Sequence, residues 1–132
     1  MKLRIKGDSM RLRVSRSELA RLLGGERVED TIHFSLAQGN HLTYALESAR
    51  QPEPVRIECG AQTVTVILSD QRMKSWGGDT EVGIYGSIEL GGSDSLEVIV
   101  EKDFACLDRS EAENSDAFAN PHAESICLQP FG

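Results

Sequence analysis

The side chains best suited to metal chemistry gather near the C-terminus. Thiol, imidazole and carboxylate groups lie there within twenty-five residues, at Asp103, Cys106, Asp108, His122 and Cys127. These are ligand types that zinc prefers in proteins. One hypothesis is therefore a zinc site built from Asp103, Cys106, His122 and Cys127. The spacing argues against it, because the chain has no C-x2-C pair; in the alternative, Cys106 packs under Phe104 and His122 is an ordinary surface residue.

Cys106 could instead act as a nucleophile. A thiolate beside an imidazole is the minimum for nucleophilic chemistry, and Cys106 could pair with His122 or His33. No glycine-rich turn and no helix start follows Cys106, so nothing in the local sequence supports this hypothesis. Whether the protein is an enzyme stays open at this stage.

A third candidate is a set of cations near the N-terminus. Apolar and basic residues alternate over 3–6 and again over 10–14, with Gly7-Asp8-Ser9 between them, which predicts a β-hairpin. One face of this hairpin carries five cations: Lys2, Arg4, Lys6, Arg11 and Arg13. Such a face could bind a phosphate or an acidic partner. It could equally pair with acidic strands from later in the chain.

The charge of the chain is uneven. Residues 1–27 hold eight basic and three acidic side chains, whereas the whole chain has a net charge of −7. An acidic protein is a poor general binder of nucleic acid, because phosphate affinity comes from the release of counterions by cations. The chain also lacks a P-loop, a G-x-G-x-x-G motif and interleaved aromatic residues.

The predicted hairpin leads into a short helix. Ser15 and Glu18 have the spacing of a capping box, Leu19, Leu22 and Leu23 fall on one stripe, and Gly24-Gly25 ends the helix. A helix this short is not stable alone in water, so we expect it to dock on a sheet.

Hairpins dominate the rest of the chain. Strands are predicted in pairs over 27–35 and 42–46, over 55–59 and 63–68, and over 81–90 and 96–100. Cys59 falls on the apolar face of its strand, so we expect it in the core. A second short helix over 69–76 places Met73 and Trp76 toward the sheet, with Trp76 as a packing anchor. Gly83 and Gly86 within a strand indicate a bulge or a close backbone approach.

These elements predict one α+β domain. We expect a mostly antiparallel sheet of seven or eight strands built from hairpins, with two short helices packed on it. Residues 1–106 form this sheet domain, and residues 107–132 are a polar, irregular C-terminal tail. No apolar run approaches the ~18 residues of a membrane span, and no signal peptide is evident. Three widely spaced cysteines are not a disulfide framework, so we expect a cytoplasmic protein.

Two resemblances complete the sequence evidence. The opening MKLRIKGDSMRLRVSRSELARL, the middle HFSLAQGNHLTYALES and the close LEVIVEKDFACLDRSEAENSDAFANPH resemble a family of small bacterial proteins of unknown function, over most of residues 1–122. This resemblance implies a shared single-domain fold and no known activity. About fifteen residues, with a G-[ND]-S turn, are also similar to swapped-hairpin transcription factors of antitoxin type. The hundred residues after the first helix have no predicted counterpart in that fold.

Taken together, the residues predict a cytoplasmic, non-enzymatic binding or accessory protein. Its basic hairpin face would hold an anionic or acidic partner, either a protein or a small anion. The alternative is a metal-binding protein or a small metal- or thiol-dependent enzyme with its site in the C-terminal cluster.

Overall fold

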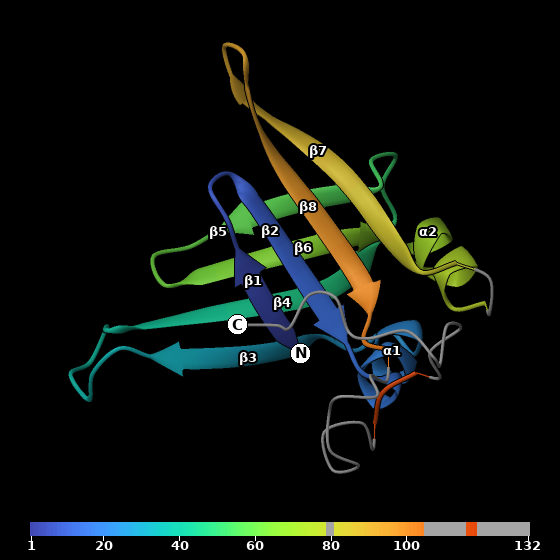
Figure 1. Ribbon diagram of the computed structural model, residues 1–132, viewed down its shortest axis with the longest axis horizontal. Coiled ribbons are helices and arrows are strands. Elements are labelled where there is room, and N and C mark those ends of the chain that lie inside the picture. The colour runs from blue at the N-terminus through green and yellow to red at the C-terminus, as the bar shows by residue number, and fades with distance from the viewer. Residues whose placement is uncertain (79–80, 105–115, 119–132) are drawn as a thin grey trace.

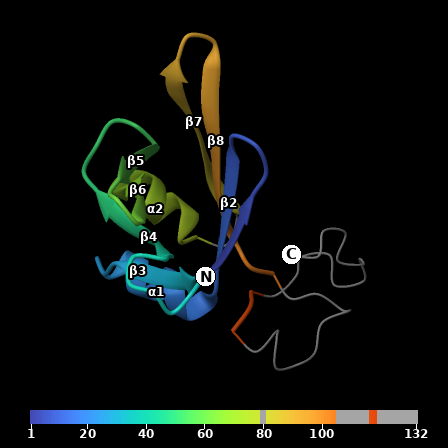
Figure 2. The same cartoon turned by 90° about the vertical axis from the view of Figure 1, so that its left-hand side faces the viewer.

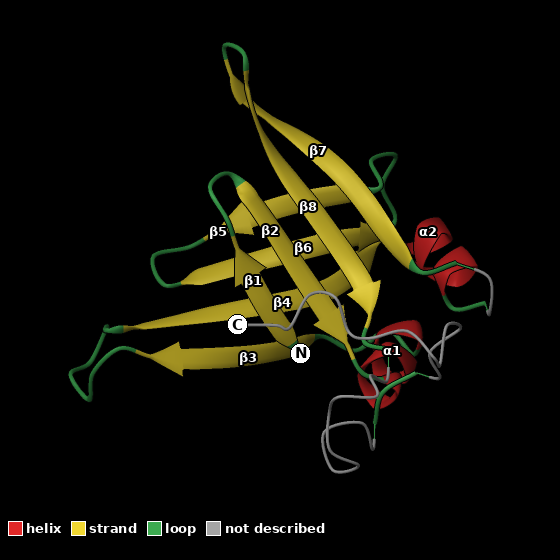
Figure 3. Cartoon of the chain, in the orientation of Figure 1, coloured by secondary structure: helices red, strands yellow, loops and turns green. Residues whose placement is uncertain are grey.

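The computed structural model describes residues 1–78, 81–104 and 116–118. These residues form eight strands and two short helices, which confirms the α+β class (Figures 1 and 3). In chain order the elements are β1 (Lys2–Ile5), β2 (Ser9–Val14), α1 (Arg16–Leu23), β3 (Val28–His33), β4 (His41–Ala49), β5 (Val55–Cys59), β6 (Thr63–Ser69), α2 (Asp70–Trp76), β7 (Gly83–Gly91) and β8 (Asp94–Lys102).

The eight strands divide between two sheets rather than forming one. Sheet 1 has the order β1-β2-β8-β7, and sheet 2 has the order β3-β4-β6-β5. The antiparallel hairpins are β1–β2, β3–β4, β5–β6 and β7–β8, whereas the central pairs β2·β8 and β4·β6 are parallel. Figure 2 shows the sheets as two layers. Each sheet therefore joins one hairpin from each half of the chain.

The two halves of the chain are related by an internal pseudo-two-fold axis. Each half runs hairpin, helix, hairpin, and residues 54 positions apart occupy equivalent places. Leu3 pairs with Leu12 as Ile57 pairs with Val66. The parallel pairs obey the same relation: a backbone hydrogen bond from Glu97 N to Asp8 O, 2.9 Å long, corresponds to one from Thr43 N to Gln62 O, 2.8 Å long. Residues 55–102 thus repeat the arrangement of residues 2–49.

Both helices lie at one end of the sheets (Figure 3). The predicted capping box is present in α1, where the Ser15 side chain accepts from Glu18 N and the Glu18 side chain accepts from Ser15 N. Leu19 and Leu22 are buried, but Leu23 is 46% exposed, so the predicted stripe is narrower than expected. In α2 the predicted anchor Trp76 is fully buried and donates a 2.9 Å hydrogen bond from Nε1 to Val82 O. Buried tryptophans usually satisfy their N–H in this way.

The two sheets meet closely along one edge. A Cβ added to Gly86 on β7 would lie 2.9 Å from Cβ of Val55 on β5, which explains the glycine as a close backbone approach. At the symmetry-related edge, where the start of β1 meets β3, ion pairs are present instead. The Met1 amine lies 3.3 Å from Asp30 Oδ2 and 2.6 Å from Glu18 Oε2. Burial lowers the pKa of this amine, but the two carboxylates outweigh that effect and leave its pKa raised.

The last described residues dock beside α1 and the end of β8. Phe118 N donates to Asp103 O at 2.8 Å, and the rings of Phe104 and Phe118 meet edge-on at 6.2 Å. Lys102, which is buried, places its ammonium 5.4 Å from the Phe118 ring and donates to Gly78 O at 2.6 Å. The resembling motifs around residues 101–104 and 116–118 therefore pack together. The predicted boundary between 106 and 107 falls outside the described residues.

Candidate functional site

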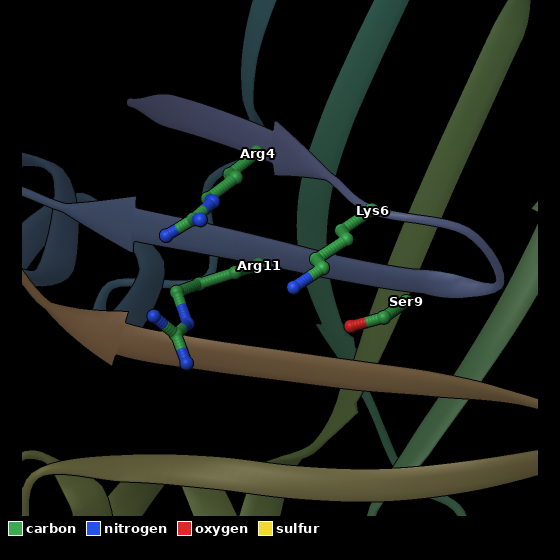
Figure 4. A pocket seen from close by; sticks show the side chains of 4 residues that line it. All are labelled: Arg4, Lys6, Ser9 and Arg11. Carbon is green, nitrogen blue, oxygen red and sulfur yellow. The ribbon is translucent and has the colours of Figure 1, made fainter. Parts of the chain in front are cut away.

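A polar pocket lies on the outer face of sheet 1. Its lining side chains are Arg4, Lys6, Ser9 and Arg11, and its volume is about 180 Å³. Figure 4 shows the four side chains on the same side of the β1–β2 hairpin, with Lys6 and Ser9 near its turn and Arg4 and Arg11 farther along it. We call these four residues the basic pocket.

The hairpin itself brings these residues together. Arg4 and Arg11 are directly paired across the antiparallel β1–β2 ladder. At the turn, Lys6 N donates to Ser9 O at 2.9 Å and Ser9 N donates to Lys6 O at 3.1 Å. Gly7 has a φ of +56°, which a residue with a side chain rarely adopts. The alternation and the turn residues thus place three cations and one hydroxyl within one small area.

Acidic residues approach part of the basic face. Arg11 Nε lies 3.0 Å from Glu101 Oε1, and Arg13 Nε lies 4.0 Å from the same oxygen. Lys2 Nζ lies 3.0 Å from Asp103 Oδ2. The predicted pairing with later acidic strands is therefore made by Lys2, Arg11 and Arg13. Arg11 also lines the pocket, together with Arg4, Lys6 and Ser9 (Figure 4).

The other sheet carries no equivalent of the basic pocket. The pseudo-two-fold axis relates the pocket residues Arg4, Lys6, Ser9 and Arg11 to Glu58, Gly60, Thr63 and Thr65. These residues have the same hairpin register as their counterparts, so the fold can be built without cations at these positions. The internal repeat was not predicted from the sequence. The feature that indicates it is the pair of helix-capping serines, Ser15 and Ser69, each of which follows a hairpin.

Ile99 and Tyr85 lie beside the basic pocket on the same face, where Glu97 and Glu101 flank Ile99 along β8. Arg11 pairs with Ile99 on β8, and Ile99 pairs with Tyr85 on β7, so the three residues lie in one row across the sheet. Tyr85 is 51% exposed. Partial burial raises the pKa of the Tyr85 hydroxyl, and the nearby Glu101 carboxylate raises it further. Tyr85 is therefore neutral at physiological pH and offers a ring face and a hydrogen-bond donor.

A second, apolar cavity opens between the two sheets. Its volume is about 200 Å³, and it is lined from both halves of the chain, among others by Leu3, Ile57, Met10 and Val64. Cys59 also lines it and is exposed, so the prediction that Cys59 lies in the core was wrong. Alternation assigned Cys59 to the inner face, but this residue ends β5 and borders the open cavity, so it stays exposed.

Most of the predicted metal and nucleophile residues lie outside the described part of the chain. These are Cys106, Asp108, His122 and Cys127. Of the predicted metal ligands, Asp103 is described, and it pairs with Lys2. Residues 1–78, 81–104 and 116–118 contain no group of three or more potential metal ligands. His33 lies beside His41, with ring centroids 6.0 Å apart. The zinc site and the Cys106 nucleophile stay predictions.

A family model described as a family of unknown function (DUF7009) matches residues 1–122. No curated protein and no solved structure matches the chain. Within the described residues, no helix is long and apolar enough to span a membrane.

Proposed function

The chain belongs to the DUF7009 family of unknown function, and from the geometry of sheet 1 we propose that it is a non-enzymatic binding protein whose basic pocket holds an anionic group of its partner. The pocket would contact a phosphate or carboxylate through Arg4, Lys6 and Arg11, with Ser9 as a neutral donor. Charge-assisted hydrogen bonds of this kind are about twice as strong as neutral ones.

The observation that carries the proposal is the contrast between the two sheets. Equivalent positions of the same hairpin hold Arg4 and Arg11 in sheet 1 but Glu58 and Thr65 in sheet 2. Because both hairpins have the same register, the cations are not a requirement of the fold. Three cations and a hydroxyl within one small area are donor types that suit an anion.

Glu101 supports the proposal by its position. Its carboxylate lies beside Arg11 and Arg13, while Arg4 and Lys6 come from the hairpin edge away from β8. The carboxylate therefore orients the Arg11 guanidinium at one side of the pocket, and the pocket still has more basic than acidic lining residues. An anion entering it meets donors that are already positioned, which lowers the entropic cost of binding.

We place the protein in the cytoplasm. The exposed free thiol of Cys59 is compatible with a reducing compartment, where thiols persist.

The test is calorimetric titration with inorganic phosphate and, separately, with a hexaglutamate peptide. The double variant Arg4→Gln/Lys6→Gln should weaken binding of the recognised anion by about tenfold or more, since each lost charge-assisted bond contributes about 1.5–3 kcal/mol. The control is Arg56→Gln/Lys74→Gln, which removes two exposed cations from other elements and changes the net charge equally.

The control separates a site from a general charge effect. Retained affinity in the control with loss in the pocket variant supports the proposal. Equal losses in both variants, or no saturable binding of either anion to the wild type, would contradict it.

A further inference from the structure

The outer face of sheet 1 continues from the basic pocket into an exposed aromatic side chain. The pairing registers place Arg4, Arg11, Ile99 and Tyr85 in a single row across β1, β2, β8 and β7. Alternate residues of a strand face opposite sides of a sheet, and directly paired residues face the same side. The row therefore changes from two cations to an aliphatic side chain and then to an aromatic ring.

The equivalent row of sheet 2 has a different character. It runs Glu58, Thr65, Ala45 and Glu29 across β5, β6, β4 and β3. The β5–β6 and β4–β6 pairings match those of sheet 1, but the β3–β4 register is shifted by two residues, so Glu29 completes this row. Thr31, which lies 54 positions before Tyr85, is not aromatic either, so the fold does not require an aromatic residue there. In sheet 1 the row combines a cationic end with an aromatic end, and both ends are absent from the row of sheet 2.

The spacing of this row sets the size of a ligand that could use both ends. Neighbouring strands lie about 4.8 Å apart, so Arg11 and Tyr85, which are two strands apart, are separated by roughly 10 Å at the backbone. Long arginine and tyrosine side chains can lean toward each other over Ile99 and shorten this span. A single small molecule with an anionic group and a planar ring can bridge it.

We propose that the row binds a phosphomonoester attached to a planar aromatic ring, as in a nucleoside monophosphate. The phosphate would occupy the basic pocket, and the ring would stack on Tyr85 above Ile99. This inference rests on the proposed function, since it uses the basic pocket as its phosphate end. A compact phosphate accepts hydrogen bonds from several donors at once, which suits the convergence of Arg4, Lys6, Ser9 and Arg11. Ring stacking on an aromatic side chain tolerates different bases, so the site would bind nucleoside monophosphates in general and not one particular base.

The test compares four probes on the full chain by calorimetry: inorganic phosphate, adenosine, adenosine 5′-monophosphate and a short single-stranded oligonucleotide without terminal phosphates. The monophosphate should bind about tenfold or more tightly than phosphate, given the usual contribution of one stacked base. Tyr85→Ser should abolish this advantage and leave phosphate affinity unchanged. Tyr85→Phe should restore the advantage, because it keeps the ring.

The outcomes separate this inference from the proposed function. If phosphate binds but the monophosphate gains nothing, or Tyr85→Ser weakens both probes equally, the stacking site is refuted while the basic pocket stands. If the oligonucleotide binds more tightly than the monophosphate, the partner is a nucleic acid strand and this inference is also wrong. If neither phosphate nor monophosphate binds, both proposals fail.

Discussion

Arg11 Nε lies 3.0 Å from Glu101 Oε1 across the parallel pair β2·β8. The oxygen is buried, yet among the described residues no donor makes a well-aligned hydrogen bond to it. The contact is therefore an ion pair at the edge of the basic pocket whose main effect is electrostatic. It connects residues ninety positions apart in the sequence and sets the local charge that an entering anion meets.

Glu101→Gln tests that electrostatic effect. Glutamine keeps an oxygen that can hold Arg11 in place but removes one negative charge from beside Arg11 and Arg13, so we expect the affinity for the recognised anion to rise several-fold. The loss of stability should be at most about 1 kcal/mol, because partly exposed ion pairs contribute little. Titration of the variant and urea unfolding measure the two effects. Weaker anion binding in a stable variant would show that Glu101 is needed to hold Arg11 in place.

Gly86→Ala tests the close contact between the sheets. The new Cβ would lie 2.9 Å from Val55 Cβ, so β7 or β5 must shift, and we expect a loss of about 1–3 kcal/mol in the free energy of unfolding. Gly60→Ala is the matched control, since its nearest neighbour is Thr63 Cβ at 3.8 Å. Urea unfolding of both variants measures these changes in the free energy of unfolding. An equal or smaller loss for Gly86→Ala than for Gly60→Ala would mean that the sheets do not approach so closely there.

Asp116→Asn tests the docking of the last described residues on α1. The Asp116 carboxylate accepts from Ser17 Oγ and, at 3.1 Å, from Ser17 N. The Ser17 hydrogen bond lowers the pKa of this carboxyl. A lowered pKa means that ionised Asp116 stabilises the fold above the ordinary carboxyl pKa of about 4, and that this stabilisation is lost as pH falls through the lowered pKa.

The wild type should therefore be more stable than Asp116→Asn near neutral pH, and the difference should shrink in acid. Thermal unfolding midpoints between about pH 2 and pH 7 measure it. Ser17→Ala serves as a second variant, because it removes the partner and should weaken the same acid dependence. A difference between wild type and Asp116→Asn that stays constant with pH would contradict the assignment.

Local patterns predicted most of the elements. The hairpins, the Ser15–Glu18 capping box and the buried Trp76 depend on residues close together in the sequence, so alternation and spacing are enough to predict them. The division into two sheets was not predicted, because the parallel pair β2·β8 joins Ser9 to Glu97, and a pattern of alternation does not specify distant partners.

The candidate site was predicted to a similar extent. The five cations could be placed on one face from alternation alone, and pairing with later acidic strands was one of the two interpretations. The particular partners, such as Glu101 for Arg11, and the alignment of Tyr85 with that row depend on long-range register. The burial of Cys59 was predicted wrongly because alternation assigns a face to a residue but does not show whether side chains cover that face.

The most direct test of the central claim is amide chemical-shift mapping by NMR during titration of the full chain with inorganic phosphate. The account predicts saturable shifts centred on Arg4, Lys6, Ser9 and Arg11, and their disappearance in Arg4→Gln/Lys6→Gln. The equivalent residues of sheet 2, Glu58, Thr63 and Thr65, should stay unchanged and provide an internal control. Shifts spread evenly over both hairpins, or no saturable shifts even when hexaglutamate replaces phosphate, would contradict the claim that this pocket binds an anion.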